Sequence, residues 1–249
     1  MHAVDLALST LFVPRCASCD ARVAPGQPLC ATCMVSVDPL GPACPHCAEP
    51  MELPPLATAP ICARCRRTPP PYELLIAPWR FGGELARVLR RLKFAGRPEL
   101  ARELAPMLVP FFHEVVVTAA IDVVVPVPLH WRRLAGRGYN QAQVLAAEML
   151  AAARPGLIRA GHPLRLDPLT LRRRRATPPQ TGLSAAERAR NLAGAFAVAP
   201  RRAARLRGRR VLVVDDVATT GATIAEATRT LLAAGAAAVV GFTVARAGD

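Results

Sequence analysis

The pattern of cysteines constrains this chain more than any other feature of its sequence. All eight cysteines lie in the first 65 residues, as four CxxC pairs: Cys16/Cys19, Cys30/Cys33, Cys44/Cys47 and Cys62/Cys65. The gaps between successive pairs are ten, ten and fourteen residues. A CxxC turn can aim both sulfurs at one metal ion, and two such turns complete the four-thiolate shell that Zn²⁺ accepts. The spacing therefore predicts two zinc sites of four cysteines each.

Two pairings of the four turns are compatible with two zinc sites. Successive turns pair most simply, which assigns the first four cysteines to one ion and the last four to the other. The spacing leaves open a crossed pairing of the first turn with the third and the second with the fourth. In either case we expect a structural role, because about 50 residues with few large apolar side chains need a staple to hold a core.

Disulfide bonds and a redox CxxC motif are the alternatives to zinc. Disulfides need an oxidising compartment. The apolar stretch 6–13 lacks the basic flank and the cleavage site of a signal peptide. A redox CxxC is usually single and lies in a βαβ context. We therefore expect zinc and a cytoplasmic protein, and no apolar run reaches the ~18 residues that a membrane span needs.

A change of pattern after residue 68 predicts a second domain. Three successive prolines, 69–71, form a stiff connector, so the expected domains are 1–68 and 72–249. In the second domain, strand-like and helix-like segments alternate, which predicts an α/β fold with an open, largely parallel sheet flanked by helices. The expected strands are 72–79, 121–127, 210–214 and 238–245, and the expected helices are 83–94, 98–117, 139–153 and 221–234.

The segment VLVVDDVATTGAT, residues 211–223, is the most informative part of this domain. Four apolar residues predict a buried strand, and Asp215 and Asp216 follow at its carboxyl end, where open α/β sheets bind ligands. A Thr/Gly turn then leads into a helix, whose positive end offers backbone N–H groups to a phosphate. Gly221 lets a ligand approach the backbone closely. A ribose 5-phosphate suits both the acidic side and the phosphate side of this element.

This segment resembles the signature of type I phosphoribosyltransferases, which bind 5-phosphoribosyl-1-pyrophosphate (PRPP), at every defining position. The resemblance implies that Asp215 and Asp216 are the catalytic acids and bind the ribose hydroxyls directly or through Mg²⁺. The 6-oxopurine transferases carry an Asp where this chain has Thr219, which argues weakly against activity on hypoxanthine or guanine. The residues implied to hold the 5-phosphate are Ala218, Thr219, Thr220, Gly221, Ala222 and Thr223.

Two basic segments supply further candidate phosphate ligands. Segment 126–141, PVPLHWRRLAGRGYNQ, leads from a strand end through a basic turn into a helix. Arginine forks and backbone amides there suit a diphosphate. Segment 170–210 carries twelve arginines and one acid, and its prolines at 178–179 and Gly182 indicate a mobile loop that can close over the site. The candidates from the first segment are Arg132, Arg133, Arg137 and Gly138.

Lys93 is the only lysine among 32 basic residues. A single lysine in a chain that otherwise uses arginine indicates a place that needs a compact ammonium, and we hypothesise that it contacts the pyrophosphate or the 5-phosphate of PRPP. The alternative is an ordinary residue of a helix surface. The formal charge of +14 favours polyanionic partners, although 4% aromatic residues is little for a platform that stacks single-stranded bases.

The order of these motifs resembles the ComF family along nearly the whole chain. The motifs are the four CxxC pairs, LKF at 92–94, PVPLHWRRLAGRGYNQ, RRRRATPPQTGLSAAERARNLAGAF at 172–196, and VLVVDDVATTGAT. The resemblance implies a double zinc ribbon, a type I phosphoribosyltransferase fold, and a link to competence and to DNA uptake or use. It leaves the acceptor open. Expected partners are PRPP and single-stranded DNA or DNA-processing proteins, and the alternatives are a non-catalytic PRPP sensor and a DNA-binding adaptor.

Overall fold

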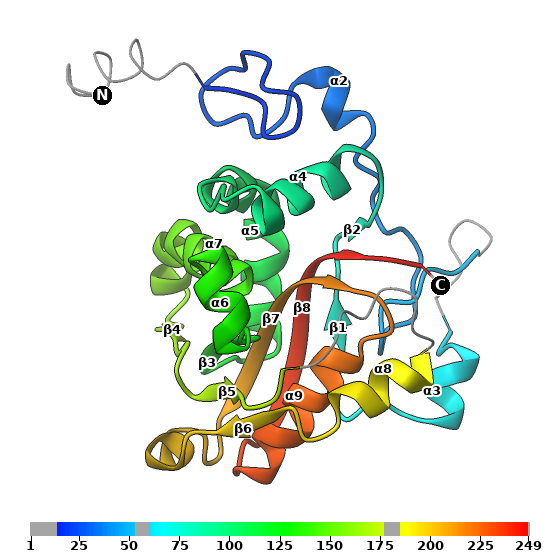
Figure 1. Ribbon diagram of the computed structural model, residues 1–249, viewed down its shortest axis with the longest axis vertical. Coiled ribbons are helices and arrows are strands. Elements are labelled where there is room, and N and C mark those ends of the chain that lie inside the picture. The colour runs from blue at the N-terminus through cyan, green and yellow to red at the C-terminus, as the bar shows by residue number, and fades with distance from the viewer. Residues whose placement is uncertain (1–13, 53–59, 177–184, 249) are drawn as a thin grey trace.

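A parallel sheet forms the centre of the computed structural model, which describes residues 14–52, 60–176 and 185–248 (Figure 1). Along the sheet the order is β1-β8-β7-β3-β4, and β2 also pairs with β8. Every pairing in this sheet is parallel, so the expected open parallel α/β sheet is confirmed. The strands are β1 (Leu75–Ile76), β2 (Trp79–Arg80), β3 (Val123–Pro126), β4 (Arg165–Leu166), β7 (Arg210–Ala218) and β8 (Ala238–Arg246).

The two long strands β7 and β8 lie in the interior of the sheet and are buried on both faces. All nine residues of β8 are buried, and the four apolar residues at 211–214 of β7 are 0% exposed. Such continuous β-branched runs are typical of parallel strands covered by helices on both sides. β7 is longer than the expected strand 210–214, because Asp215, Val217 and Ala218 continue the pairing with β8.

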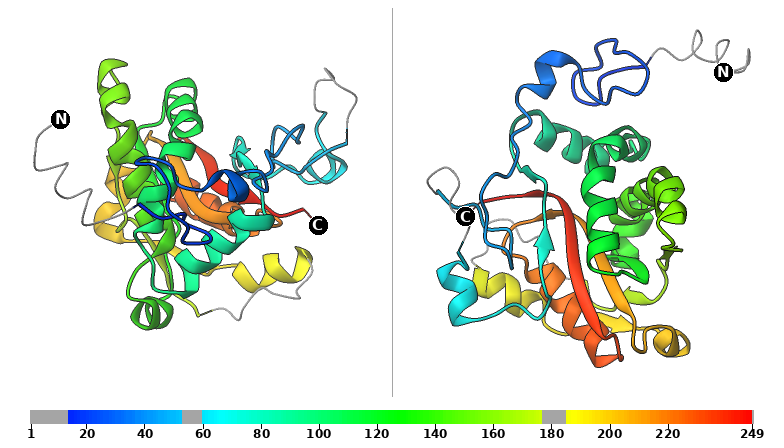
Figure 2. Two further views of the ribbon diagram at one scale, coloured as in Figure 1. Left: turned by 90° about the horizontal axis from the view of Figure 1, so that it is seen from above. Right: turned by 180° about the vertical axis from the view of Figure 1, so that it is seen from behind.

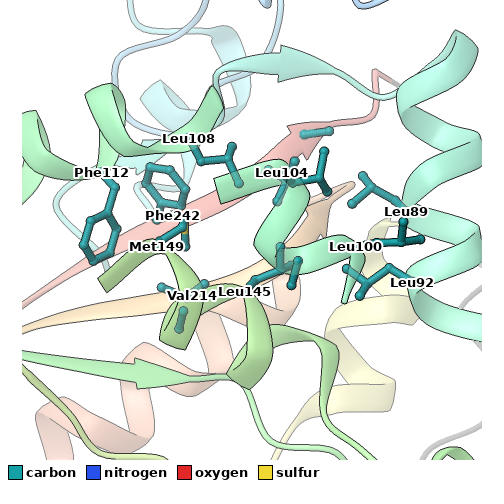
Figure 3. Packing of buried hydrophobic residues seen from close by; sticks show 14 of the residues in the cluster. Leu89, Leu92, Leu100, Leu104, Leu108, Phe112, Leu145, Met149, Val214 and Phe242 are labelled. Atoms are coloured by element: carbon teal, nitrogen blue, oxygen red, sulfur yellow. The ribbon is translucent and has the colours of Figure 1, made fainter. Parts of the chain in front are cut away.

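Helices cover both faces of the sheet (Figures 1 and 2). Leu212 and Val214 of β7 face one helical layer, while Val211 and Val213 face the other. In the first layer, Phe112 packs edge to face on Phe242 of β8 with 6.0 Å between ring centroids, and Figure 3 shows Leu108 beside them and the other labelled leucines of this core farther along the layer. The first layer contains α4 (Gly83–Phe94), α5 (Leu100–Thr118) and α7 (Gln141–Arg159), and the second contains α9 (Ala222–Ala233).

A proline explains one difference from the expected elements, whereas other prolines lie inside helices. The single strand expected at 72–79 is two short strands, β1 and β2, on either side of Ala77 and Pro78; proline has no N–H for a sheet ladder. Conversely, α7 continues to Arg159 with Pro155 inside it, and α5 contains Pro106 and Pro110. In the described part of the chain, no helix combines the length and the apolar character that a membrane crossing requires.

Shorter elements complete the described structure. The strands β5 and β6 form an antiparallel pair from the basic segment 170–210. Residues 177–184, where a mobile loop was expected, lie outside the described residues, as does the stretch 6–13. The short elements are α2 (Ala31–Met34), α3 (Ala63–Arg67), α6 (Trp131–Arg137), β5 (Leu171–Arg173), α8 (Ala185–Leu192), β6 (Phe196–Val198) and the 3₁₀ helix η1 (Pro200–Arg205).

The cysteine-rich segment packs along the sheet domain in two separate places. Its first half shares a hydrophobic core with α4, to which Leu29 and Val37 contribute. Its second half lies beside β1 and β2: the Leu75 N–H donates to the His46 carbonyl at 2.9 Å, and the Arg80 N–H donates to the Asp38 carbonyl at 2.9 Å. Figure 1 shows the first half beside α4, away from the α3 end of the segment.

Candidate functional site

A cavity of about 690 Å³ opens at the carboxyl end of β7. Its walls come from the connection between β7 and α9, from helix α4, from the segment between β3 and α7, and from the basic segment that contains β5 and α8. Because β7 lies between β3 and β8 in the interior of the sheet, this is the edge at which open α/β sheets bind their ligands.

Most of the site residues predicted from the sequence line this cavity. Three do not. The Thr220 hydroxyl accepts the Ala222 N–H at 3.4 Å, the Arg132 guanidinium lies 5.3 Å above the Trp131 ring, and Gly138 ends α6 with a left-handed φ of 82°. The predicted residues that line the cavity are Lys93, Arg133, Arg137, Asp215, Asp216, Ala218, Thr219, Gly221, Ala222 and Thr223.

The acid pair is buried and joined to the single lysine. Asp215 and Asp216 are 9% and 3% exposed, and the Asp216 N–H donates to Oδ1 of Asp215 at 2.9 Å. Lys93, which is 123 residues away in the sequence, donates from Nζ to Oδ2 of Asp216 at 2.8 Å. Lys93 thus contacts the acid side of the cavity, whereas the sequence suggested a phosphate contact.

The two carboxyl groups differ in their affinity for a proton. Burial raises the pKa of Asp215 well above its ordinary value, and the charge of Asp216 raises it further. Burial acts on Asp216 in the same direction, but the charge and the hydrogen bond of Lys93 outweigh it, so the pKa of Asp216 is lowered. The pair therefore holds its negative charge on Asp216, and Asp215 is the carboxyl group that a bound cation would ionise.

The turn after β7 has the geometry of an anion cradle. Gly221 is the N-cap of α9 with a φ of 77°, in the left-handed region. A Cβ atom at this position would lie 2.7 Å from the Tyr72 hydroxyl oxygen, so both conformation and space require glycine. The first N–H groups of a helix have no partner within it and carry the positive end of the helix dipole. Thr219 and Thr223 line the cavity beside these groups.

Arginines form a cationic part of the cavity wall. Arg137 donates to Oε1 of Gln141, and its guanidinium lies 5.4 Å from the centre of the Phe94 ring. Arg173 lies 5.6 Å above the Phe196 ring. Burial lowers the pKa of Arg173, and the charge of Arg133 lowers it further. Arg137 and Arg173 are half-buried and Arg133 is exposed. A group of guanidinium groups on one cavity wall is suited to bind an anion with several charges.

Besides the predicted site residues, the cavity wall includes four polar side chains and one aromatic ring of note, among them two arginines of the basic segment 170–210. Arg90 lies three residues before Lys93 in α4, and Phe94 lies four residues after Arg90, so helical spacing was a signal that could have found both. For Arg173 and Arg188 the signal was only the general excess of arginine in their segment, and for Gln141 it was only the proximity to Arg137. The five residues are Arg90, Phe94, Gln141, Arg173 and Arg188.

The eight cysteines form two zinc-binding sites of four thiols. Within each site the four sulfurs lie within 4.8 Å of one another, and successive turns pair, so the crossed pairing is wrong. All eight cysteines are free. The Cys19 and Cys30 sulfurs are 3.7 Å apart, as are those of Cys47 and Cys62, far beyond the ~2.05 Å of a disulfide. This donor set suits Zn²⁺, which takes four thiolates in a tetrahedron.

In each site, backbone N–H groups favour the thiolate form of one cysteine, which is the form that zinc binds. Burial alone would raise the pKa of Cys16, but hydrogen bonds from the backbone of Cys19, Cys30 and Ser18 outweigh it and lower the pKa to about 7. Cys44 in the second site has a pKa of about 7 for the same reason. The sites differ in burial: Cys19 of the first is exposed, while all four cysteines of the second are buried.

Comparison with known proteins agrees with this architecture. Residues 7–70 match a double zinc ribbon domain, and residues 135–248 match a phosphoribosyl transferase domain. DNA utilization protein YhgH of Escherichia coli (strain K12) is 37% identical over 181 residues, which cover 72% of this chain and 74% of that protein. Competence protein F of Haemophilus influenzae is 29% identical over 191 residues, which cover 75% of this chain and 78% of that protein. With its double zinc ribbon and its phosphoribosyltransferase domain, this chain belongs to the ComF family.

Proposed function

We propose that this chain binds PRPP in the cavity at the end of β7 and transfers the phosphoribosyl group to an acceptor with release of pyrophosphate. The observation that carries the proposal is that the acid pair, the α9 turn and the arginines line one cavity. PRPP presents three groups with different needs. Its 5-phosphate needs an anion cradle, its ribose diol needs hydrogen-bond acceptors, and its pyrophosphate needs cations.

Each wall of the cavity has a role in this proposal. The turn at 218–223 holds the 5-phosphate at the N-terminus of α9. Asp215 and Asp216 accept hydrogen bonds from the ribose hydroxyls. The arginine wall, with Arg133, Arg137 and Arg173, faces the pyrophosphate. Lys93 shares the acid side of the cavity and can turn from Asp216 to the pyrophosphate once a cation or the ribose occupies the acids.

Magnesium fits the acid side of this cavity. Mg²⁺ prefers carboxylate and phosphate oxygens, and Asp215 and Asp216 are adjacent carboxyl groups that line the cavity together. When bound with PRPP, the ion would neutralise charge on the pyrophosphate leaving group. The burial that keeps Asp215 protonated also means that a cation must displace its proton, so the affinity for Mg²⁺ should increase with pH.

The chain's own residues then promote cleavage of the bond between the anomeric carbon and the pyrophosphate oxygen. As this bond breaks, the ribose ring gains positive character, and the charge on Asp216 stabilises it. The arginines neutralise the departing pyrophosphate. The apolar side chains of Phe81 and Leu89 also line the cavity and limit the access of water, which would otherwise compete with the acceptor.

The names of the relatives support a role in competence or DNA utilisation. The net charge of +14 is favourable for a nucleic-acid partner, and a non-catalytic PRPP sensor or a DNA-binding adaptor of the uptake machinery are the other candidate functions. A cytoplasmic location belongs to the same proposal, because a reducing compartment keeps thiols available for zinc.

Calorimetric titration with PRPP and Mg²⁺ tests the proposal. We expect the wild type to bind and the Asp215→Asn/Asp216→Asn double variant to lose binding while it keeps its circular dichroism spectrum. Asp38→Asn is the matched control, because Asp38 is an exposed acid outside the cavity, and it should bind like the wild type. A folded, zinc-loaded wild type that does not bind PRPP contradicts the proposal.

Two further readouts separate the candidate functions. Pyrophosphate release in the presence of candidate acceptors identifies a transferase, whereas a sensor binds PRPP without turnover. A DNA-binding adaptor binds DNA with a steep salt dependence that the double variant retains.

A further inference from the structure

Arg246 is a buried cation that the proposed reaction does not use. It is the last residue of β8, it is 0% exposed, and it is the largest of the fully buried side chains among the described residues. Burial of a guanidinium group is costly unless its donors are satisfied and its charge is balanced. The partners of Arg246 therefore indicate why the fold retains it.

The partners of Arg246 belong to two different sites. On one side, Nε donates to the Cys47 carbonyl at 3.2 Å, and Nη2 forms an ion pair with Glu49. Cys47 is a ligand of the second zinc site. On the other side, Nη1 donates to the Ala247 carbonyl at 2.8 Å and to the Ala218 carbonyl at 3.4 Å. Ala218 is the first residue of the proposed phosphate turn.

A second contact joins the same zinc turn to the same phosphate turn. The His46 carbonyl, inside the third CxxC turn, accepts the Leu75 N–H at 2.9 Å. Three residues before Leu75, the buried Tyr72 places its hydroxyl oxygen 2.7 Å from the position that a Cβ atom of Gly221 would take. The zinc turn 44–47 thus supports both the beginning and the middle of the phosphate turn 218–223.

We propose that Arg246 is a positioning residue that couples the second zinc site to the phosphate turn, so that an intact zinc turn keeps residues 218–223 in their binding geometry. The planar guanidinium contacts the Cys47 carbonyl, the Ala218 carbonyl and Glu49 from three separate nitrogens, whereas a lysine offers a single nitrogen. The effect on the turn follows from these contacts alone, and the effect on PRPP affinity rests on the proposed function.

Amide hydrogen exchange of Ala225 and Ala247 tests the coupling without any ligand, because their N–H groups donate to two carbonyls of the phosphate turn, those of Gly221 at 2.9 Å and Ala218 at 2.8 Å. In zinc-loaded Arg246→Lys we expect exchange of these amides to be about tenfold faster, the size of effect expected from the loss of a hydrogen bond to a charged group. We also expect faster zinc transfer from the second site to a chromogenic chelator. Glu49→Gln keeps the shape of the side chain but removes the charge opposite Arg246, and it should shift both rates in the same direction by less.

Arg91→Lys is the matched control at the other zinc site. The Arg91 guanidinium donates to the Ala17 and Ser18 carbonyls of the first CxxC turn, each at 2.8 Å, and it belongs to α4. This variant should speed the loss of the first zinc and leave exchange of the Ala225 and Ala247 amides unchanged. Unchanged exchange of these two amides in folded Arg246→Lys and Glu49→Gln would overturn the coupling.

PRPP titration of the same variants separates this proposal from the proposed function. If the wild type binds PRPP, the dissociation constant of Arg246→Lys should increase about tenfold together with the faster exchange. Faster exchange in a protein whose wild type does not bind PRPP supports the coupling and rejects PRPP as the ligand. An unchanged PRPP affinity despite faster exchange counts against the role of the zinc turn in ligand binding.

Discussion

At the scale of single residues, the acid pair connects ligand binding with stability. Folding raises the pKa of Asp215, so the folded state binds its proton more tightly, and this group lowers stability as the pH rises above the ordinary carboxyl pKa of about 4. Folding lowers the pKa of Asp216, so this group contributes stability above its unfolded pKa, and the contribution is lost as the pH falls through its folded pKa. The two acids therefore have opposite effects at neutral pH.

The corresponding prediction concerns two single substitutions. Asp215→Asn should raise the free energy of unfolding at pH 7 by about 1 kcal/mol, because it removes a buried carboxyl group whose ionisation is unfavourable. The gain should vanish near pH 4. Asp216→Asn should lower stability at pH 7, by less than about 1 kcal/mol, because Lys93 is one-third exposed and its pairing is screened by solvent. Urea unfolding at both pH values measures these changes, and a stability loss in Asp215→Asn at pH 7 contradicts the assignment.

At the scale of the elements, the turn between β7 and α9 depends on Tyr72 from the other end of the domain. Gly221→Ala should lower the free energy of unfolding by about 2 kcal/mol, because alanine is strained at a φ of 77° and its Cβ would collide with the Tyr72 hydroxyl. Tyr72→Phe removes that oxygen and should recover part of the loss in the double variant. Denaturant unfolding of the four proteins gives the coupling free energy.

The strained backbone conformation should persist in the double variant, so recovery should be partial. Strictly additive losses from the two substitutions would show that Tyr72 and Gly221 do not share this space. The coupling free energy between Tyr72 and Gly221 also tests whether the start of β1 supports the start of α9, because Tyr72 lies just before β1 and Gly221 caps α9.

At the scale of the whole molecule, the two zinc sites differ in exposure and in what they support. The first site has exposed Cys19 and half-buried Cys30, while the second site is buried and is linked to the phosphate turn through Arg246. We expect a chelator to remove zinc in two phases, from the first site before the second, and native mass spectrometry should show a one-zinc intermediate. Cys19→Ser should keep the second zinc. Simultaneous loss of both ions would contradict this order.

The sequence by itself determined the features that short contiguous segments encode. The CxxC turns and the run from strand to acids to helix at 211–223 carry their chemistry within a few residues, where backbone geometry is local. The alternation of strands and helices predicted the parallel sheet for the same reason. Domain limits at 68–72 and the roles of the site residues stay predictions.

Only the tertiary structure decided which distant residues meet. It paired the CxxC turns in succession, brought Lys93 to Asp216 across 123 residues, and selected Arg173 and Arg188 for the cavity from a segment of twelve arginines. It also buried Arg246 between the second zinc turn and the phosphate turn. Such contacts depend on how helices and strands pack over the whole chain. A hydrophobic pattern with a period of two or 3.6 residues shows which face of an element is buried, but it does not show which distant element covers that face.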